Sequence, residues 1–576
     1  MSSKTFVRAA GATLIAAAAL VGGIVGGRAF GTQRASVGGA GGRVTSDYNE
    51  ALSVISDNYV DAVDYEKASE AAIQGMLWSL DPHSNFFTKA EYQRLLQDQE
   101  SRFTGIGVSI LRHRDGVYVQ TPIEGTPAAR AGLRFGDRIV EVDGRDAREW
   151  STQEVSKAVR GPEGERVTIK IERAGTAAPQ YFTIVRASVP QPSIRNVFMI
   201  RPGVGYVGMT GGFTQTTAEE LTDALERLRR EGMQQLVLDL RGNPGGLLDQ
   251  SIKVASKFVA RGAPVVSVRG RGGEEVREYK NNIGDPVDHP LVVLINRNSA
   301  SASEIVAGAV QDHGRGLIVG ETSFGKGLVQ KVYQLPYGAG LTLTTAKYYT
   351  PYGRSIQRDY SAGSIYDYYT RHAPGAEPSP QTPTHPTHAE TPSRQTAASP
   401  TPTATPSPTP TPGGPAIRTA AGRVFYGGGG IAPDYEVKPL DVTSPVRSRI
   451  FEESFHFVRR LIGGEIAGLE SYRLTAGPQF GRYPRPTDLP VSEDVVKAFR
   501  EFARRDPESG LKPAQLDAEI EYVKLRLRED IISAAYGGDA ASRFLLESDP
   551  QLLRALELLP EARALAENVR RILASN

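Results

Sequence analysis

Three serines in one short segment are candidates for nucleophilic chemistry. Ser299, Ser301 and Ser303 lie between a hydrophobic run, 291–296, and an apolar helical pattern that begins at Ala302. A serine at such a strand-to-helix turn has an exposed hydroxyl group and free backbone N–H groups beside it. Helix capping is the alternative role, and we prefer it for Ser299 and Ser303. Residue type and spacing alone do not rank the three.

A serine nucleophile needs a base, and Lys326 is the candidate. It lies between Gly325 and Gly327, with the apolar Phe324 and Leu328 nearby in the sequence. Desolvation in such surroundings lowers the pKa of a lysine from about 10.4 toward about 7–8, where the neutral amine acts as a general base.

A catalytic histidine and a metal-dependent hydrolase fit the sequence less well than a lysine base. His313 follows Ser301 by 12 residues at the end of the same predicted helix, about 18 Å away at about 1.5 Å per residue. We interpret it as a helix C-terminal residue, which the helix dipole favours. Neither an HExxH motif nor a metal-spaced cluster is present, so a metal hydrolase is not indicated.

The segment 320–327 nearly fits the phosphate-binding pattern G-x4-G-K-[ST]. Gly327 replaces the Ser or Thr that binds magnesium, and the residues that follow, 328–335, have a strand pattern. No helix N-terminus is therefore expected to hold a phosphate, and nucleotide hydrolysis is a weak alternative.

A glycine-rich turn, 239–247, contains Gly245 and Gly246. Glycines let backbone N–H groups approach a substrate closely, as an oxyanion hole requires. This turn is predicted to lie in the same sheet as the serine segment.

Alternating strands and helices position these turns. The expected strands are 235–240, 264–268, 291–296, 316–320, 328–334 and 341–348, and the expected helices are 247–259 and 302–312. Such alternation predicts an α/β sheet with functional residues at its strand-to-helix turns.

The flanking regions have other patterns. Residues 105–187 contain short β runs at 116–120, 138–142 and 167–171, and one helix, about 152–160, opened by a capping box of Ser151 and Glu154. Apolar residues fall at helical spacing in 45–99 and from about 444 to the end, including a final run over 550–573.

Composition limits the chemistry further. The 576 residues correspond to about four domains, and the net charge of +2 gives no case for nucleic-acid binding. The chain has no cysteine, which excludes disulfides, thiol nucleophiles and cysteine-ligated metals.

The N-terminus predicts export. Lys4 and Arg8 precede an uncharged stretch, 9–27, which is longer than a usual signal-peptide core and just reaches the length of a membrane span. We expect residues 1–34 to be a retained membrane anchor or a cleaved signal peptide, and the rest of the chain to lie outside the cytoplasm.

A low-complexity tract, 374–415, holds 13 prolines and 10 threonines. Such a composition buries no core and predicts a solvated, extended linker. Structured composition returns at 424–434, so the tract is interpreted as an insertion.

Taken together, the chain resembles the carboxy-terminal processing peptidases, or tail-specific proteases, which are serine proteases with a Ser–Lys dyad. The resemblance rests on the motifs at 238–247, 299–308, 320–327 and 349–357. It implies that Ser301 is the nucleophile, Lys326 the base and Gln330 the residue that orients the lysine. It implies oxyanion donors at Ala302 and at the turn with Gly245 and Gly246, and supporting structural roles for Glu304 and Arg241.

Residues 103–109 and 125–140 resemble a PDZ domain, a fold that captures a peptide C-terminus as an added strand. The turn Gly105-Ile106-Gly107 would bind the terminal carboxylate. An apolar pocket would be lined by Ile106, Val108, Val155 and Val159, although each valine has core packing as its alternative role.

The resemblance implies a multidomain α/β fold: a crotonase/ClpP-like protease core with an inserted PDZ domain and N- and C-terminal helical regions. The expected boundaries are 1–34 export segment, 44–102 helical region, 103–188 PDZ domain, 189–372 core, 373–415 linker, 416–441 core continued and 442–576 helical region. The expected function is an endopeptidase of the bacterial cell envelope that binds apolar C-terminal tails and needs no metal or organic cofactor. An adaptor protein and a homo-oligomer are further expectations, and a catalytically silent PDZ scaffold is the alternative.

Overall fold

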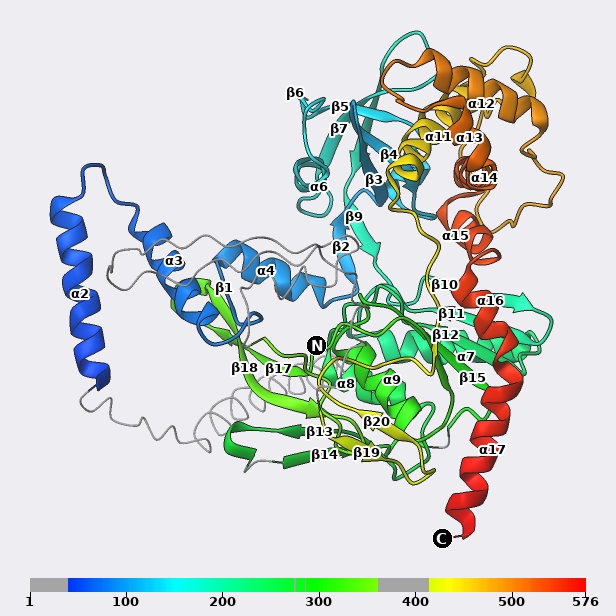
Figure 1. Ribbon diagram of the computed structural model, residues 1–576. Coiled ribbons are helices and arrows are strands. Elements are labelled where there is room, and N and C mark those ends of the chain that lie inside the picture. The colour runs from blue at the N-terminus through cyan, green and yellow to red at the C-terminus, as the bar shows by residue number, and fades with distance from the viewer. Residues whose placement is uncertain (1–39, 274–275, 285, 361–413, 576) are drawn as a thin grey trace, which may run out of the picture. The chain divides into compact units, whose positions relative to one another are not determined.

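The computed structural model describes residues 40–273, 276–284, 286–360 and 414–575 (Figure 1). The predicted export segment and residues 373–413 of the predicted linker lie outside the described residues. The chain divides into two compact units, one ending at Met76 and one beginning at Leu77.

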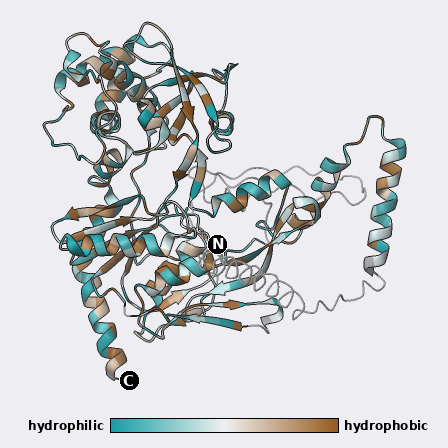
Figure 2. Ribbon diagram, turned by 180° about the vertical axis from the view of Figure 1, so that it is seen from behind, coloured by the Kyte–Doolittle hydropathy of each residue, from teal (hydrophilic) through white to brown (hydrophobic). Residues whose placement is uncertain are grey.

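The described part of the first unit is helical. It contains α2, Ala40–Asn58, and most of α3, Tyr65–Trp78. Hydrophilic and hydrophobic residues alternate along α2 (Figure 2). Within the described ranges, no helix has both the length and the apolar character needed to cross a bilayer.

The core of the second unit is a six-stranded sheet. Its order is β10 (Asn196–Arg201), β11 (Val204–Gly208), β12 (Gln235–Asp239), β15 (Leu291–Ile295), β16 (Leu317–Gly320) and β21 (Tyr435–Glu436). All neighbours are parallel except β10 and β11. The continuous apolar run of β15 is buried throughout, which is typical of a parallel strand covered on both faces.

Different helices cover the two faces of this sheet. Leu238 and Val293 face a core shared with α7 (Thr217–Arg230), α8 (Leu248–Ser256) and α9 (Ala302–Asp312). The alternate residues Val237 and Val292 pack against α16 (Pro550–Glu557) and α17 (Leu559–Ser575). The C-terminal helices are therefore part of the core fold, because they cover its second face.

The predicted final helix over 550–573 divides in two at Leu558. Pro560 lies in the first turn of α17. Because proline lacks the backbone N–H that would continue the preceding helix, it favours a new helix start at this point.

Some predicted strands form a second, antiparallel sheet. Its order is β1 (Asn85–Phe87), β18 (Gly340–Tyr349), β13 (Pro264–Arg269) and β14 (Val276–Lys280), with β17 (Leu328–Gln334) also paired to β18. The prediction of a single sheet for these strands was wrong. The region 44–102, expected to be helical, also contains a strand, because β1 lies inside it, ahead of α4 (Lys89–Asp98). β1 pairs with β18, about 255 residues away, and local sequence does not encode such a pairing.

The β-rich domain contains a sheet in the order β3 (Val108–His113), β4 (Gly116–Pro122), β5 (Arg138–Val142), β7 (Arg166–Glu172) and β8 (Gln180–Val185), and β6 (Arg145–Asp146) pairs with β5. Helix α5 (Pro127–Ala131) lies between β4 and β5 in the sequence. Helix α6, Thr152–Val159, begins with the predicted capping box of Ser151 and Glu154. The strands β2 (Arg102–Gly105) and β9 (Ala187–Pro190) pair where the chain enters and leaves this domain.

Five further helices lie between the short strands β19 (Ala416–Arg418) and β20 (Val424–Tyr426) and helix α16. They are α11 (Pro445–Gly463), α12 (Glu493–Arg505), α13 (Pro513–Ala518), α14 (Ile520–Tyr536) and α15 (Gly538–Leu546). The core shared by α11 to α14 includes Phe455 and Phe499 together with Tyr118 and Phe135 of the β-rich domain. The C-terminal region thus contacts both the β-rich domain and the central sheet.

Candidate active site

Ser301 occupies the turn between β15 and α9, where it precedes the first helical residue. Its backbone has φ = 55° and ψ = −111°, a left-handed conformation that is uncommon for residues other than glycine. Backbone strain of this kind clusters at functional sites because the surrounding structure must enforce it. The serine is buried, with 6% of its surface exposed.

The buried carboxylate of Glu304 enforces this conformation. Its Oε2 accepts hydrogen bonds from the backbone N–H of Ser301 and from that of Lys326, both at 2.8 Å. Its Oε1 accepts from the Ser323 hydroxyl at 2.5 Å and from the Gly325 N–H at 2.7 Å. Burial raises the pKa of Glu304, and these four hydrogen bonds oppose that rise because they stabilise the charged form.

Lys326 lies in the turn between β16 and β17. Its Nζ donates to Gln330 Oε1 at 2.8 Å. Burial lowers the pKa of Lys326, while the negative charges of Asp81 and Glu304 oppose that change. The environment therefore favours the neutral amine that a general base requires.

Residues before β1, which the sequence did not single out, complete the surroundings of the lysine. Gln330 Nε2 donates to the backbone carbonyl of His83. Asp81 is buried and accepts from the N–H groups of His83 and Ser84 at 2.8 and 2.9 Å. Burial, together with the charge of Lys326, lowers the pKa of His83 to about 3, so its ring is neutral near pH 7. No motif marked this segment, because its contacts to β17 span about 250 residues of sequence.

The two catalytic candidates lie in adjoining turns without direct contact. Between the described residues Ser301 and Lys326, no hydrogen bond joins Oγ to Nζ. The Ser301 Oγ instead lies 3.4 Å from the hydroxyl of Tyr348 on β18. Tyr348 was not among the residues predicted from the sequence, although it lies directly before the motif at 349–357. Burial raises the pKa of Tyr348, so its hydroxyl stays protonated near neutral pH.

A cavity of about 610 Å³ lies against both turns. Its lining includes Ala300 beside the serine, Pro244 beside the glycine pair, and the side chains of Lys326 and Gln330. A substrate bound here would contact the turns after β12, β15 and β16 together.

The glycine turn lies directly against the serine. A Cβ atom placed on Gly245, whose φ is +93°, would lie 2.7 Å from Ser301 Cβ and 2.9 Å from the Ala302 nitrogen. The Gly245 N–H donates to Asn243 Oδ1 at 2.9 Å, and its carbonyl accepts from Phe213 N–H at 2.8 Å. In the part of the chain that the structure describes, the N–H groups of Gly246 and Ala302 have no hydrogen-bond acceptor.

The other serines and His313 have structural partners. Ser299 Oγ donates to the Leu240 carbonyl at 2.8 Å, and Ser303 Oγ donates to the Asn243 carbonyl at 3.0 Å. His313 caps the C-terminus of α9, and its Nε2 contacts the Pro264 carbonyl at 2.7 Å. The turn after Gly320 leads into strand β17 rather than a helix, as the sequence predicted.

Arg241 links the glycine turn to the C-terminal helices. Its guanidinium pairs with Asp239 at the end of β12, at 2.6 Å, and with Asp549 at the start of α16, at 2.8 Å. It also donates to Gln551 at 2.8 Å. The C-terminal helices therefore support the segment that carries Gly245 and Gly246.

The candidate peptide-binding residues of the β-rich domain gather around β3 and α6. Gly105 ends β2, Ile106 and Gly107 form the turn, and Val108 begins β3. β3 is the outermost strand of its sheet. Gly107, with φ = +77°, has no room for a Cβ atom, because Thr126 would lie 2.3 Å away.

The apolar members of this set belong to the domain core. Ile106, Val155 and Val159 are buried in its hydrophobic cluster, and Val108 packs partly against it. Core packing, the alternative role considered for the valines, is thus the role they have in this state of the domain.

Comparison with known proteins agrees with this architecture. A family model described as peptidase family S41 matches residues 203–368, and a PDZ domain model matches residues 118–173. The chain is 39% identical over 315 residues to a carboxy-terminal-processing protease of Bartonella bacilliformis. The aligned region covers 54% of this chain and 72% of that protein.

Two further relatives carry similar names. The carboxy-terminal processing protease CtpB of Bacillus subtilis is 35% identical over 315 residues, covering 54% of this chain and 65% of the relative. A carboxyl-terminal-processing protease of Synechocystis is 37% identical over 293 residues, covering 50% of this chain and 68% of the relative. The chain therefore belongs to peptidase family S41, and it is a serine protease of the carboxy-terminal processing group with a PDZ domain.

Proposed function

We propose that this protease cleaves proteins through an acyl-enzyme formed on Ser301, with Lys326 as general base. The observation that carries the proposal is the shared carboxylate of Glu304, which holds the backbone of both residues. A buried lysine with a lowered pKa beside a strained serine suits this chemistry.

The reaction balances with these groups alone. Neutral Lys326 Nζ takes the proton of Ser301 Oγ as the oxygen attacks the peptide carbonyl carbon. Lys326 then returns that proton to the leaving amine, and the acyl-enzyme ester remains. A water molecule gives a proton to Lys326 and attacks the ester carbonyl carbon. The bond to Ser301 Oγ then breaks, Lys326 returns the proton to that oxygen, and the new C-terminus is released.

This step requires Ser301 Oγ and Lys326 Nζ to come within about 2.6–3.2 Å. The Gln330 side chain, whose Oε1 already accepts from the Nζ, orients the amine in the lining of the cavity. Hydrogen bonds of this kind often tighten only when substrate is bound.

We assign the oxyanion donors to the N–H groups of Gly246 and Ala302. The Gly245 N–H is occupied by Asn243, and the Gly245 carbonyl points toward Phe213. Because the carbonyl and N–H of one trans peptide point in opposite directions, the Gly246 N–H points away from Phe213. Gly245 places this peptide beside Ser301.

Substrates are proteins with apolar C-terminal tails, bound as an added strand along the outer edge of β3. The turn Gly105-Ile106-Gly107 receives the carboxylate. A tail side chain enters between β3 and α6, where Val108, Val155 and Val159 lie, and this requires the packed core at that point to open.

Incubation of purified protease with a loosely folded protein tests both parts of the proposal. The substrate ends in either an apolar or a charged tail, and fragments are identified by mass spectrometry. Cleavage should depend on the apolar tail and disappear in Ser301→Ala and Lys326→Ala. Lys331→Ala, at an exposed lysine on the same strand as Gln330, is the matched control and should cleave normally. Binding without fragments in the wild type would favour the scaffold alternative.

We further propose that the protease works in the bacterial cell envelope, on the basis of Lys4, Arg8 and the uncharged stretch 9–27. Residues 1–34 fused to a reporter that is active only outside the cytoplasm should give reporter activity, and an inactive fusion would contradict export. Adaptor binding and homo-oligomer formation stay predictions of the sequence.

A further inference from the structure

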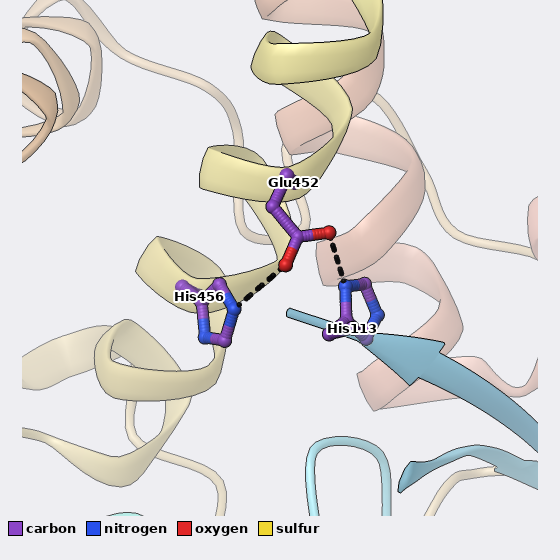
Figure 3. A group of neighbouring side chains, drawn as sticks. All are labelled: His113, Glu452 and His456. Carbon is purple, nitrogen blue, oxygen red and sulfur yellow. Dashed lines mark hydrogen bonds and ion pairs between the residues drawn. The ribbon is translucent and has the colours of Figure 1, made fainter. Parts of the chain in front are cut away.

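A second group of reactive side chains lies away from the protease site, where the β3–β4 hairpin contacts helix α11 (Figure 3). His113 ends β3, and Glu452 and His456 lie one turn apart on α11. His113 Nδ1 lies 2.8 Å from Glu452 Oε2, and His456 Nε2 lies 3.2 Å from Glu452 Oε1. The three potential ligand atoms all lie within 4.8 Å of one another.

Packing holds these side chains in place. The His113 side chain is fully buried and stacks on Phe455 with 3.6 Å between ring centroids and 8° between planes. Glu452 is fixed by a hydrogen bond from the Arg114 N–H at 2.9 Å. Residues four apart on a helix share one face, so Glu452 and His456 point to the same side (Figure 3).

The donor set has the chemistry of a transition-metal site. Two imidazole nitrogens and one carboxylate oxygen suit Zn²⁺, which binds such atoms at about 2.0–2.2 Å and prefers four ligands. Binding one ion would draw the three atoms, which lie within 4.8 Å of one another, to separations of about 3.4 Å. Asp115 supplies a further oxygen nearby, because its Oδ1 lies 3.8 Å from His456 Nε2.

A positive charge beside the cluster is paired, and a cavity reaches the cluster. The nearby Arg114 guanidinium is already paired with Glu453 at 2.6 Å and with Asp506, so its charge is compensated. His456 and Asp115 line a cavity of about 930 Å³ between α11 and α12, through which an ion can reach the cluster.

We propose that His113, Glu452 and His456 bind one divalent transition-metal ion, best matched by Zn²⁺, and that this ion fastens the PDZ domain to helix α11. His113 and Glu452 lie 339 residues apart in the sequence, so the ion acts as a reversible cross-link between two regions of the fold. Its role is separate from peptide cleavage, because none of these residues lines the cavity beside Ser301. This cluster has no recognisable metal-binding spacing in the sequence, because only Glu452 and His456 lie close together along the chain.

Untagged full-length protein, stripped with a chelator and dialysed, tests the proposal. Titration with ZnCl₂ should show one ion bound per chain and raise the midpoint of thermal unfolding by several degrees, since a ligand that binds only the folded state stabilises it. His456→Gln and Glu452→Gln should each lose most of this shift. His289→Gln, at a histidine outside the cluster, should keep it.

Two results would overturn the proposal: no ion bound at one per chain, or full zinc-dependent stabilisation retained in both cluster variants. Cobalt-substituted wild type covers the case in which a variant does not fold. X-ray absorption of the bound Co²⁺ should show two imidazole ligands and oxygen, and a spectrum without imidazole would equally refute the site.

Discussion

Glu304 accepts a hydrogen bond at 2.8 Å from the backbone N–H of Lys326, which lies 22 residues further along the chain. The same oxygen, Oε2, accepts from the N–H of Ser301 at the same distance. One buried carboxylate thus fixes the backbone of both the nucleophile and the base. It is a positioning residue, because it contacts neither reacting atom, and its effect on the reaction passes through the two turns.

Glu304→Gln is therefore expected to reduce kcat by about 10²-fold, since small displacements of reacting groups have effects of this size. The amide NH₂ would face backbone N–H donors and leave them unsatisfied, at a cost of about 1–3 kcal/mol in the free energy of unfolding. Steady-state kinetics and denaturant unfolding measure the two effects. Glu436→Gln, at an exposed glutamate, is the control, and equal kinetics in the two variants would contradict the positioning role.

The pH dependence of kcat/KM should report Lys326. A general base acts when neutral, so activity should rise with pH through the pKa of Lys326. Because burial lowers that pKa, the plateau should be reached below the usual lysine value of about 10.4. Asp81→Asn removes a negative charge that raises the pKa, so its profile should move to lower pH. A profile that does not change with pH, or one that moves to higher pH in Asp81→Asn, would exclude this assignment.

Elements with a strong local signal were predictable from the sequence. Strands β5 and β17 and helix α9 coincide with their predicted ranges. In each of them, apolar residues recur at the spacing typical of that type of element, and the pattern ends at glycine or polar residues. The order Gly245, Ser301, Lys326 was likewise readable, because each residue follows a strand of the same sheet.

Long-range partners were not predictable. The hydrogen bond from Gln330 to the His83 carbonyl and the contact of Ser301 with Tyr348 join residues on different elements, and nothing in the local pattern of either residue specifies its partner. The division of β13, β17 and β18 into a second sheet has the same cause, because strand pairing is decided by packing between distant segments. The break before Pro560 did have a local signal, since proline ends a helical run.

Gly245→Ala should reduce cleavage strongly while the protein stays folded. The new Cβ would lie 2.7 Å from Ser301 Cβ, which displaces the serine and the peptide that carries the Gly246 N–H. Loss of one oxyanion donor alone costs about 10²–10³ in kcat, so at least that reduction is expected. Burst kinetics with an ester substrate would locate the defect in acylation.

Gly242→Ala is the matched control for Gly245→Ala. Gly242 also has a left-handed φ, of +70°, but a Cβ atom there meets nothing within 4 Å. It should lose stability from backbone strain and keep its kcat. Equal losses of kcat in both variants would show that strain in the turn, and not contact with Ser301, is responsible.

Arg241→Met should destabilise the protease core, because it leaves the carboxylates of Asp239 and Asp549 without their partner. Asp239 is nearly fully buried, and breaking a buried ion pair by removing one member costs about 3–5 kcal/mol. Arg227→Met removes an exposed pair with Glu231 and should cost less than about 1 kcal/mol. Denaturant unfolding compares the two variants. Because Asp549 begins α16, Arg241→Met should also expose α16 and α17 to limited proteolysis, and equal protection of these helices in the two variants would show that Arg241 does not hold them to the sheet.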